Sequence, residues 1–244
     1  MTGFIFSLTL RQLVFRRSTL LLLALAAIPL LVGVAYKVGD STVDAEEFAV
    51  RVLCVWLVVT TVLPLTALLF GTSVLGDELE DGTVIYLLTK PLERWRILVP
   101  KILAAWLLTW VLALVAIVSA TLVVMGGDGG SVIVAFGVAT GVGSLAYTCI
   151  FVLLSLVTSR ALIAGLVFVF IWEGAVSGIF EGVRYLSVRH YTLGLADWLV
   201  DVPPRALNAY VGGLTALVMS AIVIVVASAY ANKRLQRVEI REAT

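Results

Sequence analysis

Six long apolar runs constrain the fold of this 244-residue chain more than any other feature. A bilayer core about 30 Å thick is crossed by roughly 20 apolar helical residues. Backbone groups in lipid must hydrogen-bond within their own segment, and runs this continuous do not show the alternation of barrel strands. We therefore predict an all-α membrane protein forming one domain over 1–244, with six transmembrane helices at residues 20–37, 48–74, 102–125, 132–157, 161–180 and 209–231.

The distribution of Lys and Arg predicts how these helices are oriented. Short cytoplasmic flanks of membrane spans carry an excess of basic residues. The flanks assigned to the cytoplasm contain twelve of them: Arg11, Arg16, Arg17, Lys90, Arg94, Arg96, Lys101, Arg160, Lys233, Arg234, Arg237 and Arg241. The other side has fewer, spread over longer connections. We therefore expect a multi-pass protein of the cell membrane with both termini in the cytoplasm.

The residues before the first apolar run predict a short helix at the membrane surface. In GFIFSLTLRQLVFRR, the apolar side chains of Phe6, Leu10 and Leu13 share one helical side, and Ser7 and Arg11 lie on the other. Such a pattern suits a helix in the cytoplasmic interface. We assign residues 1–19 to this interfacial helix, the alternative being a frayed basic tail that only orients the first span.

The connection at 181–208 is too long to be a simple turn between the last two spans. It contains EGVRYLSVRHYTLGLADWL, with Tyr185, Tyr191 and Trp198 at intervals. Aromatic side chains of this kind favour the membrane–water boundary. We expect an extracytoplasmic loop with one or two short helices resting at the outer membrane face.

The densest block of charge is GDELEDGTVIYLLTKPLERWR, residues 76–96, between the second and third runs. Its order is acidic, then apolar, then basic, which suits a short helix that ends before Pro91. A loop that needed only solubility would not place Ile85 and Leu88 in its middle. We interpret residues 77–100 as a cytoplasmic coupling loop whose helix docks on a partner. The alternative is that the charges only keep a loop in water.

One motif in this block resembles a known family. The pattern Glu78-x-Glu80-x-Gly82-Thr83, followed by Leu87-Leu88, Pro91, Arg94 and Lys101, is similar to the cytoplasmic signature of ABC type-2 transporter permeases. The predicted order of interfacial helix, six spans and partly helical outer loop is similar to that family over nearly the whole chain. Pro100 departs from the pattern, because many relatives have glycine before the lysine.

The resemblance implies a membrane subunit of an ATP-driven exporter. In such permeases the coupling helix contacts a separate ATPase, and the matching residues here are Glu78, Glu80, Gly82, Thr83, Leu87 and Leu88. The chain has no GxxxxGK[ST] phosphate loop, so we expect no enzyme activity of its own and no cofactor in this chain. ATP and Mg would be bound by the partner ATPase. The resemblance also implies a second permease copy, as a homodimer or with a related permease.

Polar and small residues inside the spans give further candidates. Glu173, Ser177 and Glu181 lie four residues apart in the fifth run, and an acid at this depth is costly. This stripe either lines a translocation path or gate, or Glu173 simply pairs with a neighbour such as Arg184 or Arg189 or is held protonated by burial. Glycines spaced by four suit either packing within the chain or a subunit interface: Gly174, Gly178 and Gly182, and Gly137 and Gly141. Pro29 and Pro64 are expected to loosen or kink the first two spans.

Two other classes of function were weighed. A secondary transporter or channel would use Glu173 as a proton or ion site, although no inverted repeat is evident. An intramembrane enzyme would pair Ser144 with the single histidine, His190. Cys54 and Cys149 lie inside apolar runs without a CxxC spacing, which indicates neither a disulfide framework nor a metal site. The charge pattern shows no basic block typical of nucleic-acid binding.

Overall fold

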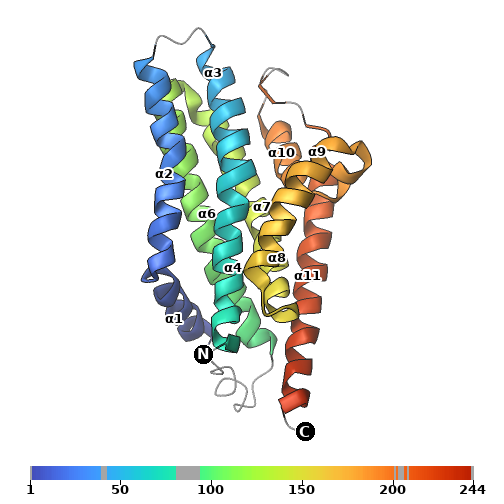
Figure 1. Cartoon of the computed structure of the whole chain (residues 1–244). Helices are drawn as coiled ribbons and strands as arrows, with labels where there is room; N and C mark the ends of the chain where they lie inside the picture. Colours follow the sequence, from blue (N-terminus) through green and yellow to red (C-terminus); the bar gives the residue numbers. More distant parts are fainter. Residues whose placement is uncertain are drawn as a thin grey trace.

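The computed structural model describes residues 2–39, 43–80, 94–200, 202, 206–207 and 209–242. Within these ranges the regular secondary structure is helical and contains no strand, so the all-α prediction is confirmed. The long helices run side by side as a bundle, and both chain termini lie at the same end of it (Figure 1). We call this the terminal end and the other the opposite end.

In the part of the chain that the structure describes, five continuous helical stretches are long and apolar enough to cross a membrane. The third, Trp95–Val157, contains two helices, α6 and α7, which run in opposite directions on either side of the short turn η2 (Figure 1). The stretches are formed by α2 (Arg17–Val38); α3 (Ala45–Phe48), η1 (Ala49–Val62) and α4 (Leu63–Glu80); α6 (Trp95–Met125), η2 (Gly126–Gly129) and α7 (Gly130–Val157); α8 (Ala161–Val167), η3 (Phe168–Val176) and α9 (Ser177–Ile179); and α11 (Gly213–Glu242).

Two of the stretches contain long π-helical segments. In η1 and η3 the backbone bonds reach back five residues, as Leu63 N–H does to the carbonyl of Val58. The sequence of η1 favours such a change, because it is rich in β-branched residues and is followed by Pro64, which has no N–H to donate. The predicted break at Pro64 is therefore a change of helix type.

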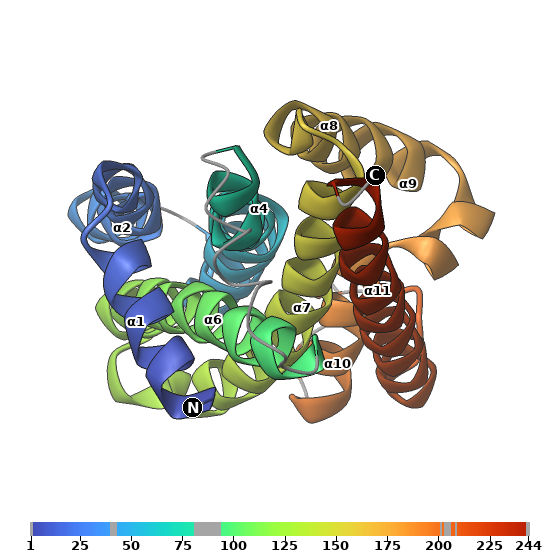
Figure 2. The same ribbon diagram turned by 90° about the horizontal axis from the view of Figure 1, so that it is seen from below.

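The core of the bundle is formed where α4, α6 and α7 meet. Seen from the terminal end, α2 and α1 lie on one side of these helices, and α8, α9 and α11 on the other (Figure 2). Small residues let α4 and α7 approach closely: a Cβ atom on Gly71 would lie 2.9 Å from Cβ of Phe151. Phe151 is fully buried there and stacks on Tyr147.

The N-terminal helix is shorter than expected. α1 (Thr2–Val14) ends before residue 19, and α2 begins at Arg17, so that the chain bends sharply at Phe15 and Arg16. The Thr19 hydroxyl fixes this bend by donating to the carbonyl of Leu13 at 2.5 Å. Below the bundle, α1 lies across α6 (Figure 2).

The connection between α9 and α11 contains helices, as predicted, but only one of the two described there, η4, lies at the surface. It contains η4 (Glu181–Leu186) and α10 (Val188–Leu199). Packing against α7 and α11 buries almost the whole of α10 through Ala196. The approach to α7 is tight, since a Cβ atom on Gly143 would lie 2.2 Å from Oγ1 of Thr192. Because its first eight residues are mostly buried, α10 is part of the bundle.

The α4–α7 contact gives a stability prediction. Gly71→Ala should lower the free energy of unfolding by about 1–3 kcal/mol, because the new methyl group overlaps the buried Phe151 side chain. Gly76→Ala is the matched control on the same helix, since its Cβ would lie 3.9 Å from Cβ of Ser155, an ordinary contact. Thermal unfolding of both variants in detergent measures the difference. Equal stability of the two would show that the helices are not packed this closely.

Candidate functional site

The predicted ATPase contact lies at the terminal end, where only part of it is described. Glu78 and Glu80 are in the last turn of α4, which continues to Glu80 beyond the predicted end of the second span. The acidic residues therefore end a long helix, whereas the sequence predicted that they begin a short one. The remaining contact residues, Gly82, Thr83, Leu87 and Leu88, lie outside the described residues, as does the centre of the predicted coupling helix.

Lys101 connects the two helices that flank this segment. Its side chain is buried, and Nζ donates to the backbone carbonyl of Val74 at 2.9 Å. Val74 belongs to α4 and Lys101 to α6, which begins at Trp95. Pro100 lies inside α6, in its second turn, where proline removes one hydrogen bond of the helical ladder. The residue that carries the end of the family motif thus holds α4 and α6 together at the terminal end.

Glu173 lies in η3, in the half of its span nearer the opposite end, and is 3% exposed. Its carboxylate binds the first turn of α10. Oε1 accepts from the N–H of Val188 at 2.9 Å. Oε2 accepts from the Ser187 hydroxyl at 2.5 Å and from the N–H of Arg189 at 3.4 Å. The predicted partners were the Arg184 or Arg189 side chains, but the hydrogen bonds come from a helix N-terminus.

These bonds complete the N-terminal cap of α10. The first four N–H groups of a helix have no partner within it. Here Ser187 N–H donates to the carbonyl of Arg184, Val188 and Arg189 donate to Glu173, and His190 N–H donates to the Ser187 hydroxyl. A carboxylate also interacts favourably with the positive end of the helix dipole. All four groups are therefore satisfied in a buried position, which links η3 to α10.

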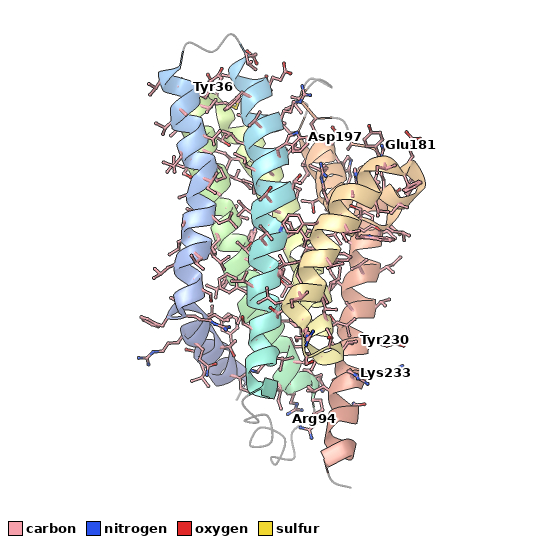
Figure 3. The ribbon with its side chains drawn as sticks, viewed as in Figure 1. Tyr36, Arg94, Glu181, Asp197, Tyr230 and Lys233 are labelled. Atoms are coloured by element: carbon pink, nitrogen blue, oxygen red, sulfur yellow. The ribbon has the colours of Figure 1, made fainter. Side chains whose placement is uncertain are left out.

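Ser177 and Glu181 do not continue a single polar stripe with Glu173. The Ser177 hydroxyl is buried and donates to the backbone carbonyl of Glu173 at 2.5 Å. The helix ends at Ile179, and the backbone at Phe180 is extended. Glu181 is consequently exposed at the periphery of the opposite end (Figure 3), where it pairs with Arg184 at 3.5 Å. Of the three residues, only Glu173 and Ser177 lie together.

Among the other groups around Glu173, the sequence indicated Arg189 but not Tyr147 or Trp56. Tyr147, from α7, is fully buried beside Glu173 and Arg189. The Arg189 guanidinium lies over the Trp56 ring of η1, with 5.9 Å from Cζ to the ring centre. Nothing in the sequence pairs Tyr147 with Glu173, because 26 residues and a turn between spans separate them. The one available signal was the acid itself, which needs polar neighbours in lipid.

The glycine stripes have different surroundings. The carbonyls of Gly137 and Gly141 accept bonds from the indole N–H groups of Trp110 at 2.9 Å and Trp106 at 2.8 Å. This stripe therefore packs within the chain, against α6. Around Gly178 and Gly182 a Cβ atom would meet nothing within 4 Å, so the second stripe is open in this chain.

The histidine and serine proposed for an enzyme make structural contacts. Ser144 donates to the carbonyl of Gly141 at 2.9 Å within its own helix. The ring of His190 packs edge-on against Tyr210, with 5.9 Å between ring centres. Burial lowers the pKa of His190 to about 4, and the charges of Arg189 and Arg184 act in the same direction. The imidazole is therefore neutral at physiological pH.

Removing the capping carboxylate should loosen α10. In Glu173→Ala the Ser187 hydroxyl and two backbone N–H groups lose their buried acceptor. We expect hydrogen-exchange protection of residues 188–192 to fall about 100-fold, or roughly 3 kcal/mol. Glu181→Ala is the control, because its exposed ion pair contributes little. Unchanged protection in Glu173→Ala would contradict the cap.

The single histidine allows a direct pH measurement. The pKa of His190 is about 4 in the folded chain and near 6.5 in the unfolded chain. Between pH 6.5 and pH 4, therefore, only the unfolded chain binds a proton at this imidazole. The contribution to stability is thus complete above pH 6.5 and is lost as the pH falls toward 4. We expect the imidazole NMR signal of untagged protein to stay constant from pH 7.5 to 5.5. The thermal stability should fall less on acidification in His190→Gln; an imidazole midpoint near 6.5 would refute the assignment.

Comparison with models of protein families matches residues 6–207 to a family described as ABC-2 family transporter protein. The match begins in α1 and extends past α10, so it includes the Glu173 cap, Lys101 and the predicted coupling segment. A comparison with individual curated proteins found no match. The resemblance predicted from residues 78–101 is therefore confirmed, over a much longer part of the chain than the motif.

Proposed function

The chain belongs to the ABC-2 transporter family, and we propose that it couples ATP hydrolysis by a separate ATPase subunit to the export of a substrate. Its membership of this family and its apolar helices identify the chain as a multi-pass ABC transporter permease. The family's membrane subunits act with an ABC ATPase, which would bind ATP and Mg. The terminal end of the bundle is proposed to face the cytoplasm, with six spans that count α6 and α7 separately.

The Lys101 bond is the observation that carries this proposal. A permease without a motor must receive force through a segment whose ends are held firmly. The segment between α4 and α6 meets that requirement, because Lys101 binds the carbonyl of Val74 where the two helices leave the bundle. A displacement of the connection by the ATPase would move both helices together. We propose ATPase contact at Glu78, Glu80, Gly82, Thr83, Leu87 and Leu88.

Movement of α4 would be passed on through tight packing. α4 continues without interruption into η1, and its Gly71 lies against Phe151 of α7. α7 in turn contacts α10, whose first turn is held by Glu173. Closely packed helices move between discrete arrangements because they do not deform continuously. We propose that ATP-driven movement at the terminal end changes the packing around Glu173 in this way.

Two permease chains are proposed to form the transporter, each with an ATPase. The open glycines Gly178 and Gly182 and the exposed apolar side chains of α8 and η3 leave this side available to a second copy. In this arrangement Glu173 and Ser177 border the translocation path or its gate. Glu181 would lie at its outer rim.

Association with the ATPase tests the proposal. The double variant Leu87→Asp/Leu88→Asp should reduce co-purification of the ATPase at least tenfold, because charge replaces the apolar centre of the proposed contact. Val43→Asp, in the connection at the opposite end, should leave association unchanged. ATPase stimulation by the reconstituted permease is the second measurement. Wild-type binding that survives in the double variant would place the contact elsewhere, and a wild-type chain that binds no ATPase would overturn the function.

A further inference from the structure

A small cavity lies inside the bundle between η1, α7, η3 and the start of α10. Its volume is about 110 Å³. Thr60 and Thr61 line it from η1, Tyr147 from α7, Glu173 from η3 and Arg189 from α10. Four elements that are distant in sequence therefore bring polar groups to one enclosed space within the apolar part of the protein.

Two of these polar groups lack hydrogen-bond partners among the described residues. The Tyr147 hydroxyl is fully buried, and although it lies near Glu173 and Arg189 it makes no bond of normal geometry with either. Nε of Arg189 is also buried and has no hydrogen-bond partner among the described residues. Buried donors without acceptors are unfavourable and rare in folded proteins. Both groups belong to residues that line the cavity, so an acceptor placed there would satisfy them.

The helices around the cavity have unusual geometry on both sides. η1 and η3 are π-helical, and the cavity touches both. The hydroxyl of Thr60 donates to the carbonyl of Val55 at 2.8 Å, and that of Thr61 to Trp56 at 3.1 Å. These bonds use the hydroxyl protons and leave the oxygens as acceptors. π-Helical turns are frequent at functional sites, and here two π-helical segments border the same space.

The balance of charge defines what could bind. Glu173 and Arg189 contribute opposite charges, and the carboxylate already accepts three hydrogen bonds from α10 and its cap. The groups left to bind a ligand are thus two donors, the Tyr147 hydroxyl and Nε of Arg189, and two acceptors, the hydroxyl oxygens of Thr60 and Thr61. An uncharged group with hydroxyl or carbonyl oxygens matches them, whereas an added full charge would upset the balance of the pair.

The size of the cavity and its apolar walls define the rest of the ligand. A volume near 110 Å³ admits a few groups of the size of water, about 30 Å³ each, but no complete lipid. Leu65, Val169 and Phe170 form apolar parts of the wall. Phe170 is 61% exposed, so it also faces the outside of this chain. A molecule bound here would place a small head inside and an apolar remainder outside.

We propose that this cavity binds the uncharged polar head of an amphipathic molecule that the transporter moves. The proposal rests on the exporter function above and assigns to it a class of substrate. Tyr147 and Arg189 donate to the oxygens of the head, and Thr60 and Thr61 accept from its hydroxyls. Glu173 is a positioning residue, since it holds the start of α10 and with it Arg189.

Photolabelling of the full chain tests this assignment. The protein is placed in phosphatidylcholine nanodiscs containing a diacylglycerol with a diazirine close to its head. Phosphatidic acid and a diacyl trimethylammonium lipid with the same labelled acyl chain are compared with it. We expect at least fivefold more labelling of peptides from α7 and η3 by the diacylglycerol. Equal labelling by all three lipids would overturn the proposal.

Two substitutions separate ligand binding from stability. Tyr147→Phe and Arg189→Lys should each reduce diacylglycerol labelling at least fivefold. Tyr147→Phe should keep or raise the melting temperature of the ligand-free protein, because the hydroxyl removed has no partner among the described groups. Tyr230→Phe, on the exposed side of α11, is the control. A Tyr147→Phe variant that labels like the wild type would show a cavity that holds only water and would overturn the site.

The same experiment distinguishes this inference from the exporter function. It uses the permease chain without its ATPase, so the result does not depend on ATP coupling. A chain that binds the ATPase but shows no selective labelling retains its function and loses the proposed site. Selective labelling of a chain that binds no ATPase would leave the site in place and refute its role in export.

Discussion

The need to satisfy every backbone hydrogen bond in lipid is the constraint on which the rest of this structure depends. It makes the apolar runs helical and explains the elaborate start of α10, which begins inside the bundle. Its first four N–H groups need acceptors there, and the fold supplies Glu173, the Ser187 hydroxyl and the Arg184 carbonyl. A costly buried acid is retained because it meets a backbone requirement.

The same constraint links the two ends of the protein. At the terminal end Lys101 donates a hydrogen bond to a backbone carbonyl of α4. At the opposite end Glu173 accepts hydrogen bonds from backbone N–H groups of α10. Between them, helix contacts depend on small residues such as Gly71 and Gly143. Each charged side chain binds the backbone of another helix, so its role is to fix the relative position of two elements. This arrangement suits the ATP-driven movement proposed for the terminal end.

The sequence predicted those features that depend on composition along one segment. Runs of apolar residues located the helices, and the cost of an acid in lipid drew attention to Glu173. Its partner could not be predicted, because the partner is a backbone terminus brought close by tertiary packing. Glu181 was misplaced in the stripe because helix periodicity was extended past Ile179, where the helix ends. Lys101 was identified through the family motif, while its bond to Val74 required the fold.

The π-helical geometry of η1 has a consequence for how this span can change shape. Over its fourteen residues the backbone bonds are offset by one residue from those of an α-helix. Removing that offset would turn the segment beyond it about the helix axis, because the angle per residue would change along the whole of η1. Arg51 and Trp56 would then face new neighbours while α4 kept its contacts. A rotation of this kind needs no hinge between the two parts of the span.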